Sequence, residues 1–273
     1  MPKKNKRKSV FDRRSKFGKG WYTGRDYQEG VYYNTFLSAR INPGSTSLLS
    51  FKNYARVVAN MKKLVPNPRN CIALEIGPGE APVIPLLPFK KMVFMDRSKA
   101  VALGLRNTVL PGKAVVERLI QDPLYEFLDF KGSASSPIRS FKGLTGKKAS
   151  IVVGDVRALP FKPSAKFDLV VLNEVLTHVR PQERTKVIEQ IAKKANSILI
   201  LDRPQISLKE LRKIREKPYY YHELSMAELR SFQATLVFFP RIIKILEHNG
   251  FEVQTKTYGD GMDSYTILRA KKK

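Results

Sequence analysis

Three acidic residues that end short apolar runs are the first candidates for chemistry in this chain. Glu75 lies at the end of one run and is followed by Gly77 and Gly79, whereas Asp96 and Asp155 close two later runs. Ligands of open α/β sheets bind beyond the carboxyl ends of the strands, and an acid about 20 residues after the first turn commonly binds ribose hydroxyls. Two glycines spaced two apart predict a turn over which a ligand can lie, because a Cβ would block its approach to the backbone.

The elements that must position these residues follow from the hydrophobic pattern. Five apolar runs alternate with helical stretches, which predicts an α/β fold with a doubly wound parallel sheet. Two further runs around a Gly-Asp-Gly turn predict a C-terminal antiparallel hairpin at the sheet edge. The predicted parallel strands are 73–76, 92–95, 151–153, 169–172 and 198–201, the hairpin strands are 251–258 and 264–270, and helical spacing starts near Phe51, Val187 and Ile242.

Four motifs in this order make the chain resemble a class I S-adenosylmethionine-dependent methyltransferase. They are E-x-G-x-G at 75–79, the strand-end acid Asp96, G-D-x-x-x-L-P-F at 154–161 and F-D-L-V at 167–170. The resemblance covers about residues 51–271 and implies a Rossmann-like methyltransferase sheet with the C-terminal antiparallel hairpin. It also implies S-adenosyl-L-methionine as the cofactor.

The resemblance further implies a role for each motif residue. The methionine part of the cofactor would lie on the turn at Gly77 and Gly79, and Glu75 would support its amino group. Asp96 would accept hydrogen bonds from both ribose hydroxyls, and Asp155 would accept one from the adenine amino group. The residues expected to bind the cofactor are Glu75, Gly77, Gly79, Asp96, Asp155, Val156 and Asn173.

Candidate catalytic residues follow the fourth predicted strand. Glu174 and His178 could act as general bases, which are needed only if the methyl acceptor carries a proton at that step. A helix or pocket-wall role for His178 remains open. The chain reads Asn-Glu-Val-Leu at 173–176, so the N/D-P-P-Y/F motif of amino-group adenine methyltransferases is missing. A single cysteine argues against covalent cytosine-C5 chemistry, and three scattered histidines predict no metal site.

A stretch of four aromatic or imidazole side chains is the candidate substrate site. It lies within a predicted insertion at 203–235, between capping boxes at 207–210 and 225–228. Such rings could clamp a base, or they could simply pack between two helices. The residues are Tyr219, Tyr220, Tyr221 and His222.

The charge of the chain points to a polyanionic partner. The net charge is +26, and residues 1–25 hold ten Lys or Arg and one Asp, a net of +9 that leaves +17 for the rest. A basic body in addition to a basic tail favours nucleic acid, with RNA preferred. Two alternatives stay open, namely a lysine-rich proteome and an anionic membrane surface.

The expected organisation has three parts. Residues 1–20 are a basic disordered arm, which could bind nucleic acid or serve as a nuclear address. Residues 21–50 interleave aromatic and basic side chains, which could stack on bases or form a lid that packs across the domain. Residues 51–273 form the methyltransferase domain, with insertions at 113–148 and 203–235.

Several functions are disfavoured by composition. The single cysteine, Cys71, cannot form an internal disulfide, which fits a reducing compartment, and it is expected to be a small buried residue. No apolar run reaches the roughly 18 residues of a membrane helix, so we expect no membrane insertion. We expect a cytoplasmic protein, and a nuclear location stays open.

Taken together, the motifs and the charge predict a methyltransferase that acts on RNA or on an RNA–protein particle. The alternatives are a small-molecule methyltransferase and a non-catalytic RNA-binding relative.

Overall fold

The computed structural model describes part of the chain. The described residues are 51–78, 82–97, 109–110, 139–140, 149–207, 209–210, 233, 236–259 and 264–273. Several predictions fall outside these residues and stay predictions. They concern the arm at 1–20, the segment at 21–50, Gly79, most of the insertions at 113–148 and 203–235, and the residues Tyr219, Tyr220, Tyr221 and His222.

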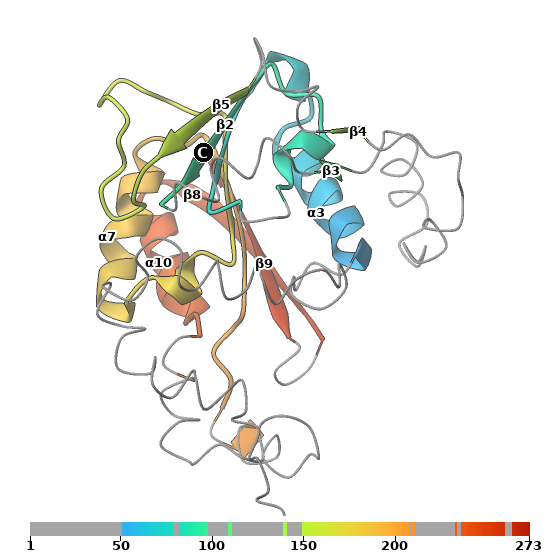
Figure 1. Ribbon diagram of the computed structural model, residues 1–273. Helices are drawn as coiled ribbons and strands as arrows, with labels where there is room; N and C mark the ends of the chain where they lie inside the picture. The colour runs from blue at the N-terminus through green and yellow to red at the C-terminus, as the bar shows by residue number, and fades with distance from the viewer. Residues whose placement is uncertain are drawn as a thin grey trace, which may run out of the picture.

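A seven-stranded mixed sheet forms the centre of the molecule (Figure 1). Its order is β5-β2-β1-β6-β7-β9-β8, in which the first five strands are parallel and β9 runs antiparallel to both β7 and β8. The predicted fold class, including the C-terminal antiparallel hairpin, is therefore confirmed. The strands are β1 (Ile72–Ile76), β2 (Lys91–Asp96), β5 (Ala149–Val153), β6 (Leu169–Asn173), β7 (Ser197–Asp202), β8 (Phe251–Tyr258) and β9 (Tyr265–Lys272).

The central strands are buried on both faces, which explains why their sequences are continuous apolar runs. In β7 all six residues are buried, and in β6 the first four are. The register aligns Ile76 of β1 with Met95 of β2 on one side and with Leu172 of β6 on the other. Residues that follow these three positions in sequence therefore emerge together at the carboxyl edge of the sheet.

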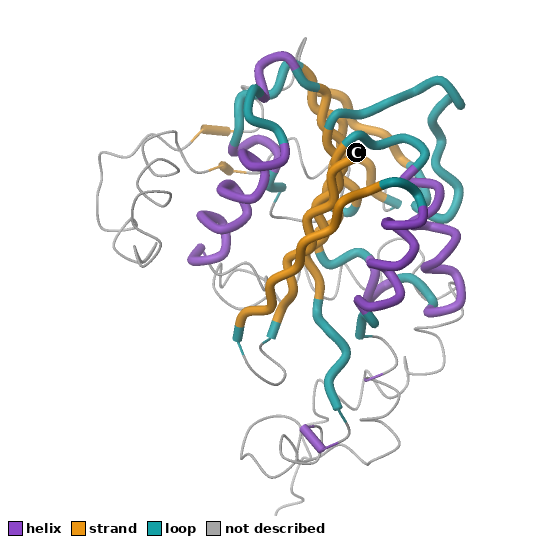
Figure 2. The backbone as a smooth tube through the Cα atoms, turned by 180° about the vertical axis from the view of Figure 1, so that it is seen from behind, coloured by secondary structure: helices purple, strands orange, loops and turns teal. Residues whose placement is uncertain are grey.

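Helices cover the two faces of the sheet unequally (Figures 1 and 2). The helix α3 (Phe51–Leu64) packs on one face, where it contacts β9 and β7. On the other face, α7 (Pro181–Ala192) and α10 (Phe239–His248) contact each other, and α10 also contacts β8. The buried side of α3 carries apolar residues at helical spacing, namely Val57, Val58, Met61 and Leu64. No described helix is long and apolar enough to cross a membrane.

Short elements complete the described chain. Three 3-10 turns, η1 (Pro68–Asn70), η2 (Ile84–Leu86) and η5 (Leu176–His178), lie next to the ends of β1 and β6. A separate antiparallel pair, β3 (Val109–Leu110) with β4 (Arg139–Ser140), joins the two sides of the long connection between β2 and β5. The sequence did not indicate this pair, because two residues are too few to show a strand period.

The first of the two predicted capping boxes is formed. The backbone N–H of Glu210 donates to Ser207 Oγ at 3.2 Å, and the backbone N–H of Ser207 donates to Glu210 Oε2 at 2.7 Å. This reciprocal pair satisfies two backbone donors at a helix start. The second box, at 225–228, lies outside the described residues.

Candidate functional site

Backbone hydrogen bonds continue past the carboxyl ends of the strands and join β1 to β2, β5 to β2 and β6 to β7. Gly77 N donates to Met95 O at 2.8 Å, and Gly154 N donates to Asp96 O at 2.9 Å. Glu174 N donates to Leu201 O at 2.7 Å. These bonds place the residues of three predicted motifs at one edge of the sheet, where ligands of α/β folds bind.

Gly77 occupies a position that only glycine fits without strain. Its φ is +62°, in the left-handed region, and a Cβ built on it would lie 2.7 Å from Val175 Cγ2. Real Cβ atoms do not approach a neighbour this closely, so an alanine would require Val175 to move. The turn after β1 is thus packed directly under the chain that follows β6.

Glu75 is completely buried, and its carboxylate is occupied by backbone donors. Val83 N lies 2.9 Å from both carboxylate oxygens, and Ile84 N lies 3.0 Å from Oε2. Burial raises the pKa of Glu75 to about 7, against the lowering effect of the hydrogen bonds from Ile84 and Val83. In this structure Glu75 holds the chain that follows the glycine turn, a structural role that its strand-end position did not reveal.

Asp96 and Asp155 lie on neighbouring strand ends in different surroundings. Asp96 ends β2 and is buried. Asp155 binds the backbone N–H of Arg157 at 2.9 Å and its guanidinium at 2.5–3.1 Å, and Arg97 Nε lies 3.6 Å away. Partial burial alone would raise the pKa of Asp155, but the hydrogen bonds and charge of Arg157, helped by Arg97, lower it. Asp155 therefore carries a negative charge at neutral pH and is already paired.

Asn173 supplies a buried acceptor at the same edge. Its Oδ1 atom is buried and has no hydrogen-bond partner among the described residues. Buried polar atoms are normally paired, so an unpaired one commonly marks a position that a ligand or water can satisfy. Asn173 ends β6, two residues before Val175, which packs against Gly77.

A fourth acid that ends an apolar run, Asp202, organises the turn after β6 and was not among the residues predicted from the sequence. Asp202 is buried at the end of β7, and its Oδ2 accepts the N–H groups of Leu176 at 2.8 Å and Thr177 at 3.3 Å. Oδ1 accepts the N–H of Arg203 at 2.9 Å. Burial raises the pKa of Asp202 to about 6, although these hydrogen bonds oppose the rise. The signal was present, since Asp202 also ends an apolar run.

The two candidate bases lie in this turn. Glu174 has a φ of +53° and is the only non-glycine residue in the described chain with positive φ. His178 ends η5, and the residue as a whole is exposed to solvent. Desolvation by the surrounding protein, followed by the charges of Arg203 and Arg184, lowers the pKa of His178. The imidazole is thus neutral at pH 7.

Strain at Glu174 leads to a prediction about stability. The left-handed backbone destabilises a folded protein by about 1–2 kcal/mol when the residue is not glycine. A glycine at this position avoids that strain, but its greater freedom in the unfolded chain cancels about 0.5–1 kcal/mol of the gain. We therefore expect Glu174→Gly to be more stable than Glu174→Ala by roughly 0.5–1 kcal/mol, as measured by urea unfolding. Both variants lose the same carboxylate, so the difference isolates the backbone term. An alanine variant as stable as the glycine variant would show that this turn stores no strain.

Comparisons with known proteins support the class that this geometry suggests. A family model described as "Methyltransferase domain" matches residues 133–199. Magnesium protoporphyrin IX methyltransferase from Synechocystis PCC 6803, solved with bound SAH, is similar in structure, with a TM-score of 0.58, 17% identity, and coverage of 92% of this chain and 99% of that chain. The plantazolicin methyltransferase BpumL, in complex with SAH, has a TM-score of 0.56, 9% identity, and coverage of 96% and 99%. No curated protein matches the sequence.

The fold is that of class I S-adenosylmethionine-dependent methyltransferases, and residues 133–199 match a methyltransferase family model. The matched family model and the SAH bound in both similar structures agree with the predicted enzyme class and with the predicted cofactor, S-adenosyl-L-methionine.

Proposed function

We propose that this protein transfers a methyl group from S-adenosyl-L-methionine to RNA or to an RNA–protein particle. The observation that carries the choice of substrate is the net charge of +26. Typical small domains carry a net charge of about 2–8. A charge this large attracts polyanions and speeds their association. We also propose that the arm at 1–20 and the aromatic and basic segment at 21–50 contribute to RNA contact, and that the protein works in the cytoplasm or nucleus.

The residues at the sheet edge fit the cofactor that the fold implies. Asn173 Oδ1 is a buried acceptor without a partner among the described residues, and the positive φ and close packing of Gly77 keep a side chain out of the first turn. We propose that the residues named in the sequence analysis hold S-adenosylmethionine, whose sulfonium supplies an already reactive methyl group. These residues are Glu75, Gly77, Gly79, Asp96, Asp155, Val156 and Asn173.

Asp155, which we propose accepts a hydrogen bond from the adenine amino group, is already paired with Arg157. The adenine amino group would therefore have to share or replace part of the contact between Asp155 and Arg157. Glu75 likewise acts through the backbone of Val83 and Ile84, which it fixes beside the first turn. The protein's main contribution is to align the acceptor with the methyl group and to exclude water.

Two residues are proposed for proton transfer, on condition that the acceptor carries a proton. Glu174 and His178 lie in the turn that Asp202 holds in place. The lowered pKa of His178 leaves its ring neutral at pH 7 but also makes it a weaker base than an ordinary histidine, because a general base works best with a pKa near the working pH. Tyr219, Tyr220, Tyr221 and His222 are proposed as substrate contacts, and they lie outside the described residues.

A small-molecule acceptor is the second candidate. The two similar structures are named for magnesium protoporphyrin IX and plantazolicin, so the fold itself is compatible with non-nucleic-acid substrates. A third candidate, a non-catalytic RNA-binding relative, predicts that the cofactor does not bind.

The deciding experiment measures transfer of a tritiated methyl group from S-adenosylmethionine to total cellular RNA, across a salt series. We expect label in the RNA fraction that declines steeply as salt rises, because phosphate contacts release counterions. Label in a protein-free small-molecule extract and none in RNA would favour the second candidate. No cofactor binding in calorimetry would leave only the third.

A further inference from the structure

We propose that the groove between α3 and the β8–β9 hairpin binds the sugar–phosphate backbone of RNA. This inference rests on the proposed function and assigns the surface through which the folded domain would contact its substrate. It concerns the face of the sheet covered by α3, away from α7 and α10 (Figures 1 and 2).

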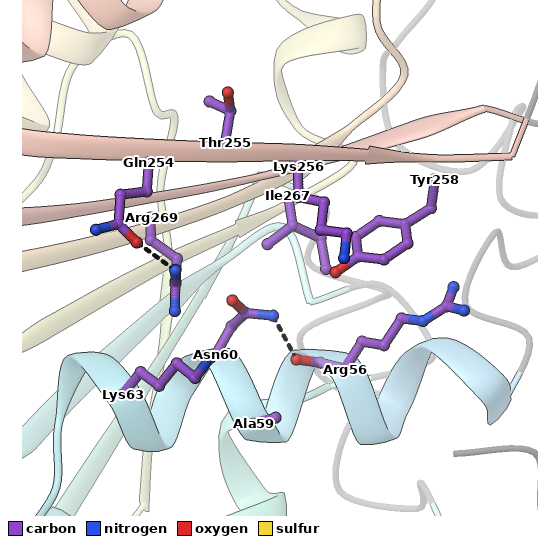
Figure 3. A pocket seen from close by; sticks show the side chains of 10 residues that line it. All are labelled: Arg56, Ala59, Asn60, Lys63, Gln254, Thr255, Lys256, Tyr258, Ile267 and Arg269. Atoms are coloured by element: carbon purple, nitrogen blue, oxygen red, sulfur yellow. Dashed lines mark hydrogen bonds between the residues drawn. The ribbon is translucent and has the colours of Figure 1, made fainter.

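The groove is a pocket of about 210 Å³ whose charged side chains, among the described residues, all have the same sign. Of the ten described residues that line it, four are cationic and none is acidic. Like charges held close together repel one another, so such an array is favoured when an anion neutralises it. The lining residues, drawn in Figure 3, are Arg56, Ala59, Asn60, Lys63, Gln254, Thr255, Lys256, Tyr258, Ile267 and Arg269.

The periodicity of the two walls explains how the cations come to face one another. On α3, Arg56, Asn60 and Lys63 are spaced by four and three residues, which places them on one side of the helix (Figure 3). On β8, Gln254, Lys256 and Tyr258 are alternate residues and share one face of the strand.

The pairing between β8 and β9 adds the fourth cation to this face. Gln254 lies opposite Arg269, and the two side chains are hydrogen-bonded. A sheet face beneath a helix is normally apolar. Here the outer part of that face is polar and basic, which indicates that the edge beyond α3 is adapted to a charged ligand.

Two tyrosines contact two of the cations, Arg56 and Lys256. Arg56 Nη1 donates to Tyr265 Oη at 2.7 Å, and the Arg56 guanidinium lies 4.4 Å from the centre of the Tyr258 ring. The two rings are stacked with centroids 5.2 Å apart, and Lys256 Nζ lies 5.3 Å from the centre of the Tyr258 ring. A cation–π contact orients a cation, and the uncharged ring places no negative charge beside it.

The groove leads towards the proposed methyl-transfer site. Asp202, which holds the turn containing Glu174, is paired with Thr266, next to Tyr265. Tyr258 pairs with Tyr265, so the Tyr258 end of the groove lies at the carboxyl edge of the sheet. Arg269 pairs with Leu199, further from that edge. An RNA strand lying in the groove would therefore run along β8 and reach the edge that carries the candidate bases.

RNA fits this surface better than a lipid headgroup layer does. Proteins that track single strands combine a basic groove with aromatic side chains, and Tyr258 lines this groove beside its cations. Surfaces that bind anionic membranes usually add exposed apolar side chains. The large exposed apolar residues of the described chain are Val153 and Phe238, and neither lines the groove.

The test compares two charge-matched triple variants of the full chain. The groove variant is Lys63→Gln/Lys256→Gln/Arg269→Gln, and it keeps Arg56 because of its contacts with the tyrosines. The control is Lys186→Gln/Arg241→Gln/Lys244→Gln, which removes three exposed cations from α7 and α10 on the opposite face. Binding of a poly-uridine RNA of about 20 nucleotides, long enough to span several phosphate contacts, is measured across a salt series, together with S-adenosylmethionine binding by calorimetry.

We expect the groove variant to lose about 2 units of the slope of log K against log salt, since each phosphate contact to a single strand contributes about 0.7. Its affinity for the RNA at about 0.1 M salt should fall by about tenfold or more. The control variant should keep a slope within about 0.7 of wild type, and both variants should bind the cofactor as wild type does. If the triple variant melts early, Lys63→Gln and Lys256→Gln alone should each lower the slope by about 0.7.

The outcomes separate this inference from the proposed function. Equal losses of RNA affinity in the two triple variants would overturn the groove and leave the RNA substrate standing. Absence of RNA binding by the wild-type chain, with the cofactor bound, would reject the RNA substrate itself. Reduced binding of the groove variant to phosphatidylserine vesicles, with RNA binding unchanged, would assign the surface to a membrane instead.

Discussion

Replacing Asp96 by alanine is expected to weaken S-adenosylmethionine binding by about 100-fold or more. Asp96 is buried at the carboxyl end of β2, where its carboxylate is proposed to accept hydrogen bonds from both ribose hydroxyls. Hydrogen bonds to a charged group contribute about 1.5–3 kcal/mol each, and every ~1.4 kcal/mol is a tenfold change in Kd. Calorimetric titration of the wild-type and variant proteins with the cofactor measures the effect.

Asp168→Ala is the matched control for this prediction. Asp168 lies at the opposite edge of the sheet, where its Oδ2 accepts the backbone N–H of Ile72 at 2.8 Å at the start of β1. Its Oδ1 also accepts a hydrogen bond from Asn196 Nδ2 at 3.3 Å. Its removal should cost stability of about 1–2 kcal/mol for the two lost hydrogen bonds and leave the Kd for the cofactor within about twofold. If Asp96→Ala binds as tightly as Asp168→Ala, the ribose role of Asp96 is wrong.

Substituting alanine for Gly77 is expected to lower the free energy of unfolding by about 3 kcal/mol and to impair cofactor binding by about tenfold or more. The left-handed backbone costs an L-residue about 1–2 kcal/mol, and overpacking adds about 1–3 kcal/mol. The overpacking arises because the new Cβ would lie 2.7 Å from Val175 Cγ2. Relief of that clash would shift the turn on which the cofactor is proposed to lie. Urea unfolding and calorimetry measure the two effects.

Gly250→Ala provides a control that shares the backbone strain and lacks the clash. Gly250 has a φ of +81°, and nothing lies within 4 Å of the position that an alanine Cβ would take. It should lose only about 1–2 kcal/mol and bind the cofactor normally. The double variant Gly77→Ala/Val175→Ala should recover part of the stability lost by Gly77→Ala. If it recovers none, the clash with Val175 does not contribute.

The overall fold was predictable from local patterns. Parallel strands buried on both faces leave continuous apolar runs in the sequence, and the runs at 73–76, 92–95 and 169–172 all lie within observed strands. The hairpin was predictable because strands of eight residues flank a glycine-rich turn. The two-residue strands β3 and β4 were not, since pairing across a long connection leaves no local signal.

The sequence by itself determined which residues reach the carboxyl edge of the sheet, because strand ends follow from hydrophobic pattern and glycine placement. Only the tertiary structure decided what each side chain does there. Glu75 turns to Val83 and Ile84, Asp155 pairs with Arg157, and Asp202 holds the turn after β6. The basic groove likewise exists only where α3 faces β8. These contacts depend on sheet register and helix packing, which join residues far apart in the chain and leave no spacing rule in the sequence.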